Sequence, residues 1–393
     1  MRVLSSLAVV ALFALIASGS FAAPPKTKPA PPPPADPNVF RTDSDPATTR
    51  TPWFTLRPRQ FPPEKSAHAI SGELIAVDAI NRTGVLRPDR TDAQRRGDWD
   101  LPLPFVMLPF GSISYHGAPA ELRDIPLGTH LHGQFYTWGN VTPPSNLIEV
   151  TRRTEDSVFG RVLKLEDDFS HAQRLGRTWR VDAVALDAGT LTVTGMSADG
   201  KADAKPIVYQ INPVTRVWKG RAVGTLNDVA VGQSIAMNLT YCSLKGPGRV
   251  AEIWLDDQSR ALATEHQLEV HRQFAREHGL AAWIDEVDNK QSIVTATFFS
   301  GVDPVLLAEF KANEGMTAAT AEESLRTYDQ INDRKGGSVV EILKAEALPG
   351  SSGVKIKFKA SMLLEGFRPG KIVRLWAGKW KVDDLPREER LYQ

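Results

Sequence analysis

Three segments of the chain share one spacing of residues: Leu122-Arg123-Asp124-Ile125-Pro126-Leu127-Gly128, Leu226-Asn227-Asp228-Val229-Ala230-Val231-Gly232 and Leu364-Glu365-Gly366-Phe367-Arg368-Pro369-Gly370. In each segment an apolar residue follows the leucine by three positions, and glycine follows three positions later. This spacing predicts one turn that leads into a strand. The third segment departs from the others because Gly366 replaces the aspartate.

A second element precedes each of these turns: Leu74-Ile75-Ala76-Val77-Asp78, Val181-Asp182-Ala183-Val184 and Ile284-Asp285-Glu286-Val287-Asp288. In the first two copies, turn residues and a strand-like run follow, which predicts a β-hairpin. The equivalent valines stand 107 and 103 residues apart. A domain-sized unit is therefore repeated three times.

The third copy carries an insertion at about 301–336 that we expect to be helical. Asp303-Pro304 is a typical helix start, so a helix is expected over 305–312. A second helix is expected from Thr320 to about Asn332, and Gly336-Gly337 would end it. Alternating apolar residues over 353–360 then predict a strand with one buried face.

Pairs of aspartates end the strands that connect the copies, Asp167-Asp168 and Asp256-Asp257. Paired carboxylates could bind a metal ion or act as acid and base. Helix-like segments follow both pairs, so we favour the interpretation that the aspartates cap these helices. Glycines at 176 and 279 would end the helices.

These patterns predict a mainly β protein with three tandem small OB-like β-barrel units joined by short helices and a helical insertion in the third. A flat sandwich is the alternative architecture. We assign the barrel units to 53–160, to 161–262 with its connector, and to 263–393 with its connector helix.

The repeated sequence motifs resemble those of uncharacterised bacterial exported proteins with tandem small OB-like β-barrel domains. The motifs are Leu74 to Asp78 with Leu122 to Gly128, and Val181 to Val184 with Leu226 to Gly232. The resemblance covers roughly residues 70–380. Its motifs are structural, so it implies no activity and no site residues.

The N-terminus predicts export. Met1-Arg2 is followed by an apolar run over 3–17 and by small residues around Ala22, so residues 1–22 are expected to be a signal peptide. An uncleaved anchor is the alternative, but the run is shorter than the roughly 20 residues of a membrane span. We therefore expect a secreted or periplasmic, envelope-associated protein with no transmembrane span after cleavage. A single cysteine, Cys242, excludes an internal disulfide.

Residues 23–52 are rich in proline, with nine of the 28 prolines between Pro24 and Pro46. Such a run forms neither helix nor sheet and prefers an extended conformation. We expect a disordered tether between the signal peptide and the barrels.

Composition and charge limit the possible partners. Hydrophobic residues make up 42% and charged residues 24% of the 393 residues, as is typical of globular proteins. The chain has 47 basic and 46 acidic residues, and cleavage of the expected signal peptide would remove only one charged residue, Arg2. Nucleic-acid binding is not expected, because it needs a clustered basic surface.

Candidate metal ligands lie near the first turn. His130 and His132 alternate along a predicted strand, so their side chains would share one face. His116 could supply a third ligand from a neighbouring strand. Against this interpretation, the second copy has no equivalent histidines and no carboxylate of obvious geometry completes the set.

Tyr136 and Trp138 are candidate binding residues, because they lie in a loop-like segment without a counterpart in the other copies. They could form an exposed platform for a sugar ring. Trp179 and Trp283 open equivalent strands and Trp254 lies in a connector, so these residues are expected to pack in cores.

No motif for a catalytic nucleophile, a nucleotide-binding loop or a zinc protease is found in the sequence. We therefore expect an exported non-catalytic module, structural or binding an envelope polysaccharide or another envelope protein, with no cofactor. The alternative is a metal-dependent enzyme or metal-binding protein that uses His116, His130 and His132.

Overall fold

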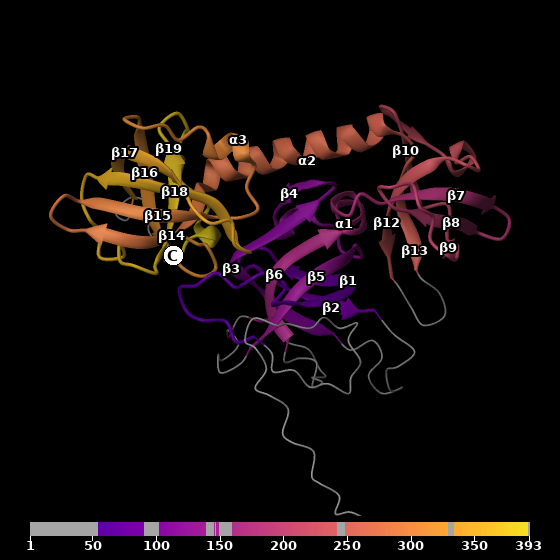
Figure 1. Cartoon of the computed structure of the whole chain (residues 1–393), viewed down its shortest axis with the longest axis horizontal. Coiled ribbons are helices and arrows are strands. Elements are labelled where there is room, and N and C mark those ends of the chain that lie inside the picture. The colour runs from indigo at the N-terminus through magenta and orange to yellow at the C-terminus, as the bar shows by residue number, and fades with distance from the viewer. Residues whose placement is uncertain are drawn as a thin grey trace, which may run out of the picture. The chain divides into compact units, whose positions relative to one another are not determined.

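The computed structural model describes residues 54–89, 102–138, 145, 147–148, 159–241, 248–328 and 334–391. The expected signal peptide (1–22), the expected tether (23–52) and Cys242 lie outside these residues. All described residues belong to one compact unit, Pro37–Gln393. The chain is mainly β and forms three closed small barrels in tandem, as predicted, rather than a sandwich (Figure 1).

Barrel 1 is closed by five strands in the order β1-β2-β3-β6-β5, and the parallel pairing of β3 with β6 completes the ring. A short strand, β4, extends β3 at its end and leads into a 3-10 turn. The elements are β1 (His68–Asp78), β2 (Thr83–Pro88), β3 (Leu103–Tyr115), β4 (Ala118–Ala120), η2 (Leu122–Asp124), β5 (His130–Thr137) and β6 (Phe159–Asp167).

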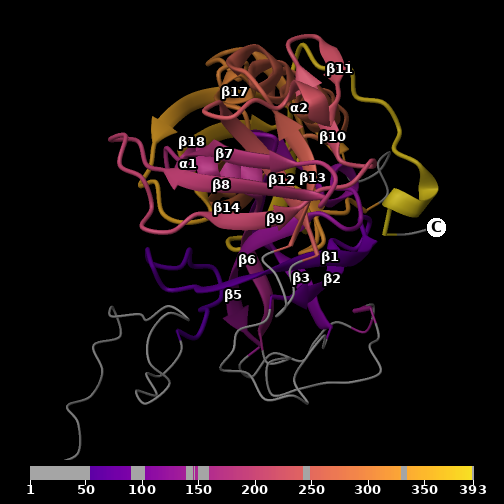
Figure 2. The same cartoon turned by 90° about the vertical axis from the view of Figure 1, so that its right-hand side faces the viewer.

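Barrel 2 repeats this plan with the order β7-β8-β9-β13-β12, and β9 and β13 again pair in parallel (Figure 2). Its third strand is interrupted, so β10 continues along β13 and forms a hairpin with β11. The elements are β7 (Thr178–Ala185), β8 (Thr190–Met196), β9 (Ile207–Gln210), β10 (Arg216–Lys219), β11 (Ala222–Gly224), η4 (Leu226–Asp228), β12 (Ser234–Thr240) and β13 (Arg249–Trp254).

Barrel 3 is a ring of six antiparallel strands in the order β14-β15-β18-β17-β16-β19. The strand that follows its glycine turn, β19, pairs with a strand from the insertion, β16, instead of with a later strand. The elements are β14 (Leu280–Asp288), β15 (Ile293–Phe299), α3 (Pro304–Leu307), β16 (Gly315–Ala321), β17 (Arg334–Lys344), β18 (Ser351–Ala360), β19 (Ile372–Ala377) and η5 (Arg387–Glu389).

The two repeated sequence elements bond directly to each other in every barrel. The glycine of each turn donates its N–H to the carbonyl of the buried residue that begins the second repeated element. These bonds join Gly128 to Leu74 at 2.8 Å, Gly232 to Val181 at 2.7 Å and Gly370 to Ile284 at 2.7 Å. The same buried residue donates its own N–H to the carbonyl of the residue after the glycine. A β-bulge follows this buried residue in all three copies, which bends the first strand around the barrel.

The first aspartate of each pair caps a connecting helix, which confirms the prediction for Asp167 and Asp256. Asp167 accepts from the Ser170 amide at the start of α1 (Asp168–Arg174), and Asp256 accepts from the Ser259 amide at the start of α2 (Asp257–His278). Gly176 and Gly279 follow these helices with φ of 63° and 74°, in the backbone region that favours glycine.

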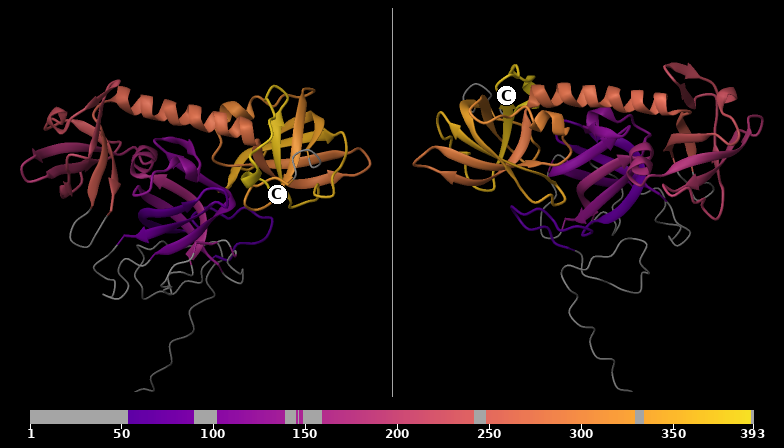
Figure 3. Two further views of the ribbon diagram at one scale, coloured as in Figure 1. Left: turned by 180° about the vertical axis from the view of Figure 1, so that it is seen from behind. Right: turned by 45° about the horizontal axis from the view of Figure 1, so that its top comes forward.

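Helix α2 connects barrels 2 and 3 and packs along β4 of barrel 1 (Figure 3). Thr264 donates to the His116 carbonyl at 2.7 Å, and Gln267 donates to the Pro119 carbonyl at 3.3 Å. Barrel 1 therefore contacts the helix that joins the other two barrels.

The two interfaces of barrel 1 differ in chemistry. Toward barrel 3 it packs aromatic rings, with centroids of Phe110 and Trp283 4.9 Å apart. Toward barrel 2 the contact also includes buried hydrogen bonds, in addition to the ring of Trp254 on that of His116. Asn238 donates to Asp167 and accepts from the Phe169 amide, both at 2.8 Å. Asn238 is only 2% exposed, so these bonds are shielded from water.

The insertion in barrel 3 differs from the prediction. Its first helix is present but short, α3 (Pro304–Leu307), with Asp303 as the cap. The prediction of a second helix from Thr320 is wrong for the described residues, because 315–321 form β16 and a turn follows. Alanine favours helices, but here Ala318, Ala319 and Ala321 are buried and the backbone pairs with both β17 and β19.

Asn238→Ala should lower the free energy of unfolding by about 1–3 kcal/mol, because it removes one hydrogen bond of the buried Asp167 carboxylate and the acceptor of the buried Phe169 amide. Urea unfolding at neutral pH would measure this change. Asn227→Ala, at an exposed position of barrel 2, is the control and should change stability by less than about 0.5 kcal/mol. An equally small effect at Asn238 would contradict the assignment of this interface.

Candidate functional site

The side chains of two histidines extend from the same side of strand β5, as their alternation predicted. Leu131 between them is fully buried in the barrel 1 core, so His130 and His132 lie on the outer face. His130 is 3% exposed, whereas the side chain of His132 is 30% exposed. The strand therefore holds one buried and one accessible imidazole next to each other.

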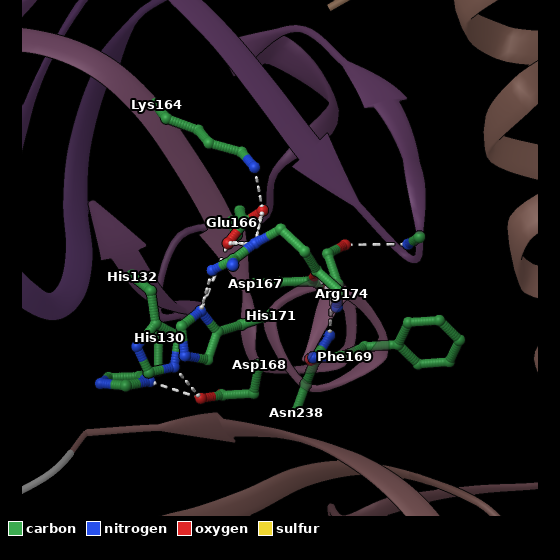
Figure 4. A network of polar contacts seen from close by, with 12 residues as sticks. His130, His132, Lys164, Glu166, Asp167, Asp168, Phe169, His171, Arg174 and Asn238 are labelled. Carbon is green, nitrogen blue, oxygen red and sulfur yellow. Dashed lines mark hydrogen bonds and ion pairs between the residues drawn. The ribbon is translucent and has the colours of Figure 1, made fainter. Parts of the chain in front are cut away.

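Asp168 joins both histidines (Figure 4). Its Oδ1 lies 2.8 Å from Nδ1 of His130 and 2.9 Å from Nε2 of His132. One potential ligand atom from each of the three residues lies within 4.8 Å of the others. The interpretation of the aspartate pair as caps holds for Asp167, but Asp168, one residue further on, points toward the strand.

Two outer contacts orient this group. The second nitrogen of His130, Nε2, lies 2.8 Å from Oδ2 of Asp89, just after β2. The second oxygen of Asp168, Oδ2, accepts from the amide of Leu239 in barrel 2 at 2.8 Å. Burial raises the pKa of Asp168, but attraction and hydrogen bonds from His130 and His132 outweigh it and hold the pKa well below its usual value.

A charged network continues from His132. Its ring stacks on His171 of α1, with centroids 3.9 Å apart and planes at 12°. His171 Nδ1 lies 3.3 Å from Glu166, which also pairs with Arg174 and Lys164. Burial raises the pKa of Glu166, but these three partners outweigh it and lower the pKa strongly. The network fixes the ring plane of His132.

His116, the third ligand predicted from the sequence, is not part of this group. Its Nε2 lies 3.3 Å from Oε2 of Glu252 on β13, and its ring stacks on Tyr115 with centroids 3.8 Å apart. Its amide donates to the cap residue Asp167 at 3.1 Å. His116 therefore bridges barrels 1 and 2, a contact that no sequence spacing indicates.

Tyr136 and Trp138 do not form an exposed platform. Tyr136 is 2% exposed and its hydroxyl lies 2.6 Å from that of Ser66. Trp138 is 8% exposed and packs on Gly160, where a Cβ atom would come within 2.2 Å of the indole ring. Tyr136 is on the outer face of β5, like His130 and His132, but a second apolar cluster that includes Leu108 and Leu163 covers it.

A second polar site was not anticipated from the sequence. A cavity of about 50 Å³ between barrels 1 and 3 is lined by Arg82, Arg374, Glu121 and His271, among others. His271 Nε2 accepts from the Asp303 amide at 3.3 Å, so its proton lies on Nδ1, and this nitrogen has no hydrogen-bond partner among the described residues. The pKa of His271 falls to about 4 because burial disfavours the charged ring.

In comparisons with known proteins, no family model matches this chain, and neither a curated protein nor a solved structure gives a match. In the part of the chain that the structure describes, no helix has both the length and the apolar character needed to cross a membrane.

His271 should make the protein sensitive to acid. Because its pKa is 6.5 unfolded and about 4 folded, its contribution to stability is complete above pH 6.5 and is lost as pH falls toward 4. The loss from pH 7 to pH 4.5 should be about 2–3 kcal/mol. Urea unfolding at both values should show a smaller pH-dependent loss in His271→Asn than in the parent.

The same substitution at the exposed His266 of α2 controls for the change of residue type. Equal pH-dependent losses in His271→Asn and the parent would show that His271 does not carry this sensitivity.

Proposed function

We propose that the chain is an exported, non-catalytic module of tandem barrels that binds another protein of the cell envelope. The observation that carries this proposal is the exposure of three valines in segment 214–231 of barrel 2. Val214, Val223 and Val231 are 70%, 73% and 69% exposed. Contiguous exposed apolar patches are typical of interaction surfaces, and the proposal places these three valines in one such patch.

The internal repeat supports this choice of surface. In barrel 1 the short strand β4 packs against α2, and its Ala118 and Ala120 are 2% and 4% exposed. The equivalent strand of barrel 2, β11, has Ala222 and Val223 exposed. A partner that presents an apolar helix would cover β11 as α2 covers β4. An envelope polysaccharide is the second option, which the burial of Tyr136 and Trp138 disfavours.

The purified mature chain should co-sediment with envelope fragments in a saturable manner. Digestion of the fragments with protease, followed by removal of the protease, should abolish this binding, because the expected partner is a protein. Pellet and supernatant fractions would be measured over a range of fragment concentrations. Binding that survives the digestion would transfer the proposal to a polysaccharide.

Val223→Lys with Val231→Lys should weaken co-sedimentation, because two lysines would be desolvated in the interface. Val305→Lys, at a position of barrel 3 that is 50% exposed, is the matched control and should bind as the parent does. Sedimentation no greater than that of an unrelated soluble protein would contradict the binding function.

A further inference from the structure

We propose that His130, His132 and Asp168 bind a divalent transition-metal ion, with Zn²⁺ the best match, where barrel 1 meets barrel 2. The ligand atoms would be Nδ1 of His130, Nε2 of His132 and one carboxylate oxygen of Asp168. Imidazole nitrogen with carboxylate oxygen is a donor set that suits zinc and its first-row neighbours. The site does not depend on the proposed partner of barrel 2.

The distances are close to those a metal ion needs. The Asp168 oxygen is 2.8 and 2.9 Å from the two nitrogens. Ligand atoms about 2.0–2.1 Å from a tetrahedral ion are about 3.3 Å apart, so the oxygen and each nitrogen must separate by a few tenths of an ångström. The two nitrogens, which lie within 4.8 Å of each other, must adjust to the same separation. Strand β5 holds both histidines and the first turn of α1 holds the aspartate, so the backbone can keep this geometry.

Outer contacts provide the second independent support. Histidines that bind metal ions usually donate their other N–H to a carboxylate, and bound carboxylates are themselves hydrogen-bonded. His130 has such a partner in Asp89, at 2.8 Å from its Nε2. Asp168 has one in the Leu239 amide, also at 2.8 Å. These contacts leave Nδ1 of His130 and Oδ1 of Asp168 directed at each other.

Three protein ligands leave a fourth position of a tetrahedral ion free for water or another small ligand. His132 lies on the accessible side of the group, with 30% of its side chain exposed. Its stacking on His171 fixes the ring plane, which lowers the cost of ordering the ligand. The site can therefore exchange its metal ion and its fourth ligand with solvent.

Metal titration of the full chain, stripped with chelator, tests the proposal. Zn²⁺ should bind with one-to-one stoichiometry by calorimetry, and Co²⁺ should give the absorption bands of a tetrahedral complex. His132→Gln removes a direct ligand. It should therefore lower the affinity for Zn²⁺ by at least about 10- to 100-fold, which is the loss typical of removing an outer contact. Asp89→Asn should weaken it by about 10- to 100-fold while keeping the stoichiometry.

His266→Gln, at an exposed position of α2, is the matched control and should bind as the parent does. Circular dichroism would verify that each variant is folded. If His132→Gln does not fold, Asp168→Asn, which keeps the size of the side chain, replaces it in the same titration. Absence of stoichiometric binding, or equal affinity in the parent and the ligand variant, would overturn the proposal and leave a hydrogen-bonded cluster only.

Discussion

One pair of backbone hydrogen bonds underlies each barrel. The turn glycine donates to the carbonyl of a buried residue of the first strand, and that residue donates its own N–H to the carbonyl of the residue after the glycine. Gly128, Gly232 and Gly370 have φ between 80° and 90°, where other residues are strained. Around Gly232 a Cβ atom would meet nothing within 4 Å, so backbone conformation rather than space requires glycine there. The pair sets the register of the first strand against the closing strand. It therefore determines which side chains enter the core.

The strand that follows the glycine turn of barrel 1, β5, determines where the histidine cluster lies. Because β5 begins two residues after Gly128, its alternation places Leu131 in the core and His130 and His132 outside it. The next strand, β6, ends in two aspartates that begin a helix, and successive residues of a helix point in different directions. One carboxylate therefore caps α1 while the other reaches the histidines. Structural and chemical roles are divided between adjacent residues of the same type.

Barrel 1 occupies the central place in the network of contacts. It meets barrel 3 through aromatic rings and barrel 2 through buried hydrogen bonds. Polar groups at the second interface include the amide of Leu239, which orients Asp168. The proposed metal ion would therefore bind beside an interface between barrels, while the proposed partner would bind the uncovered hairpin of barrel 2. The two proposals concern different surfaces of the repeat.

The repeat, the turns, the helix caps and the mainly β class follow from the sequence, because local hydrogen bonds and side-chain alternation act over a few residues. The pairing of His130 with His132 follows for the same reason. Asp168, Asp89 and the bridge of His116 to Glu252 depend on contacts between strands that are distant in the chain. The insertion shows the same limit: its alanines favour a helix locally, but the open edges of β17 and β19 bind the segment as a strand. Spacing along the chain determines local geometry, whereas closure of the barrels and their contacts decides which side chains meet.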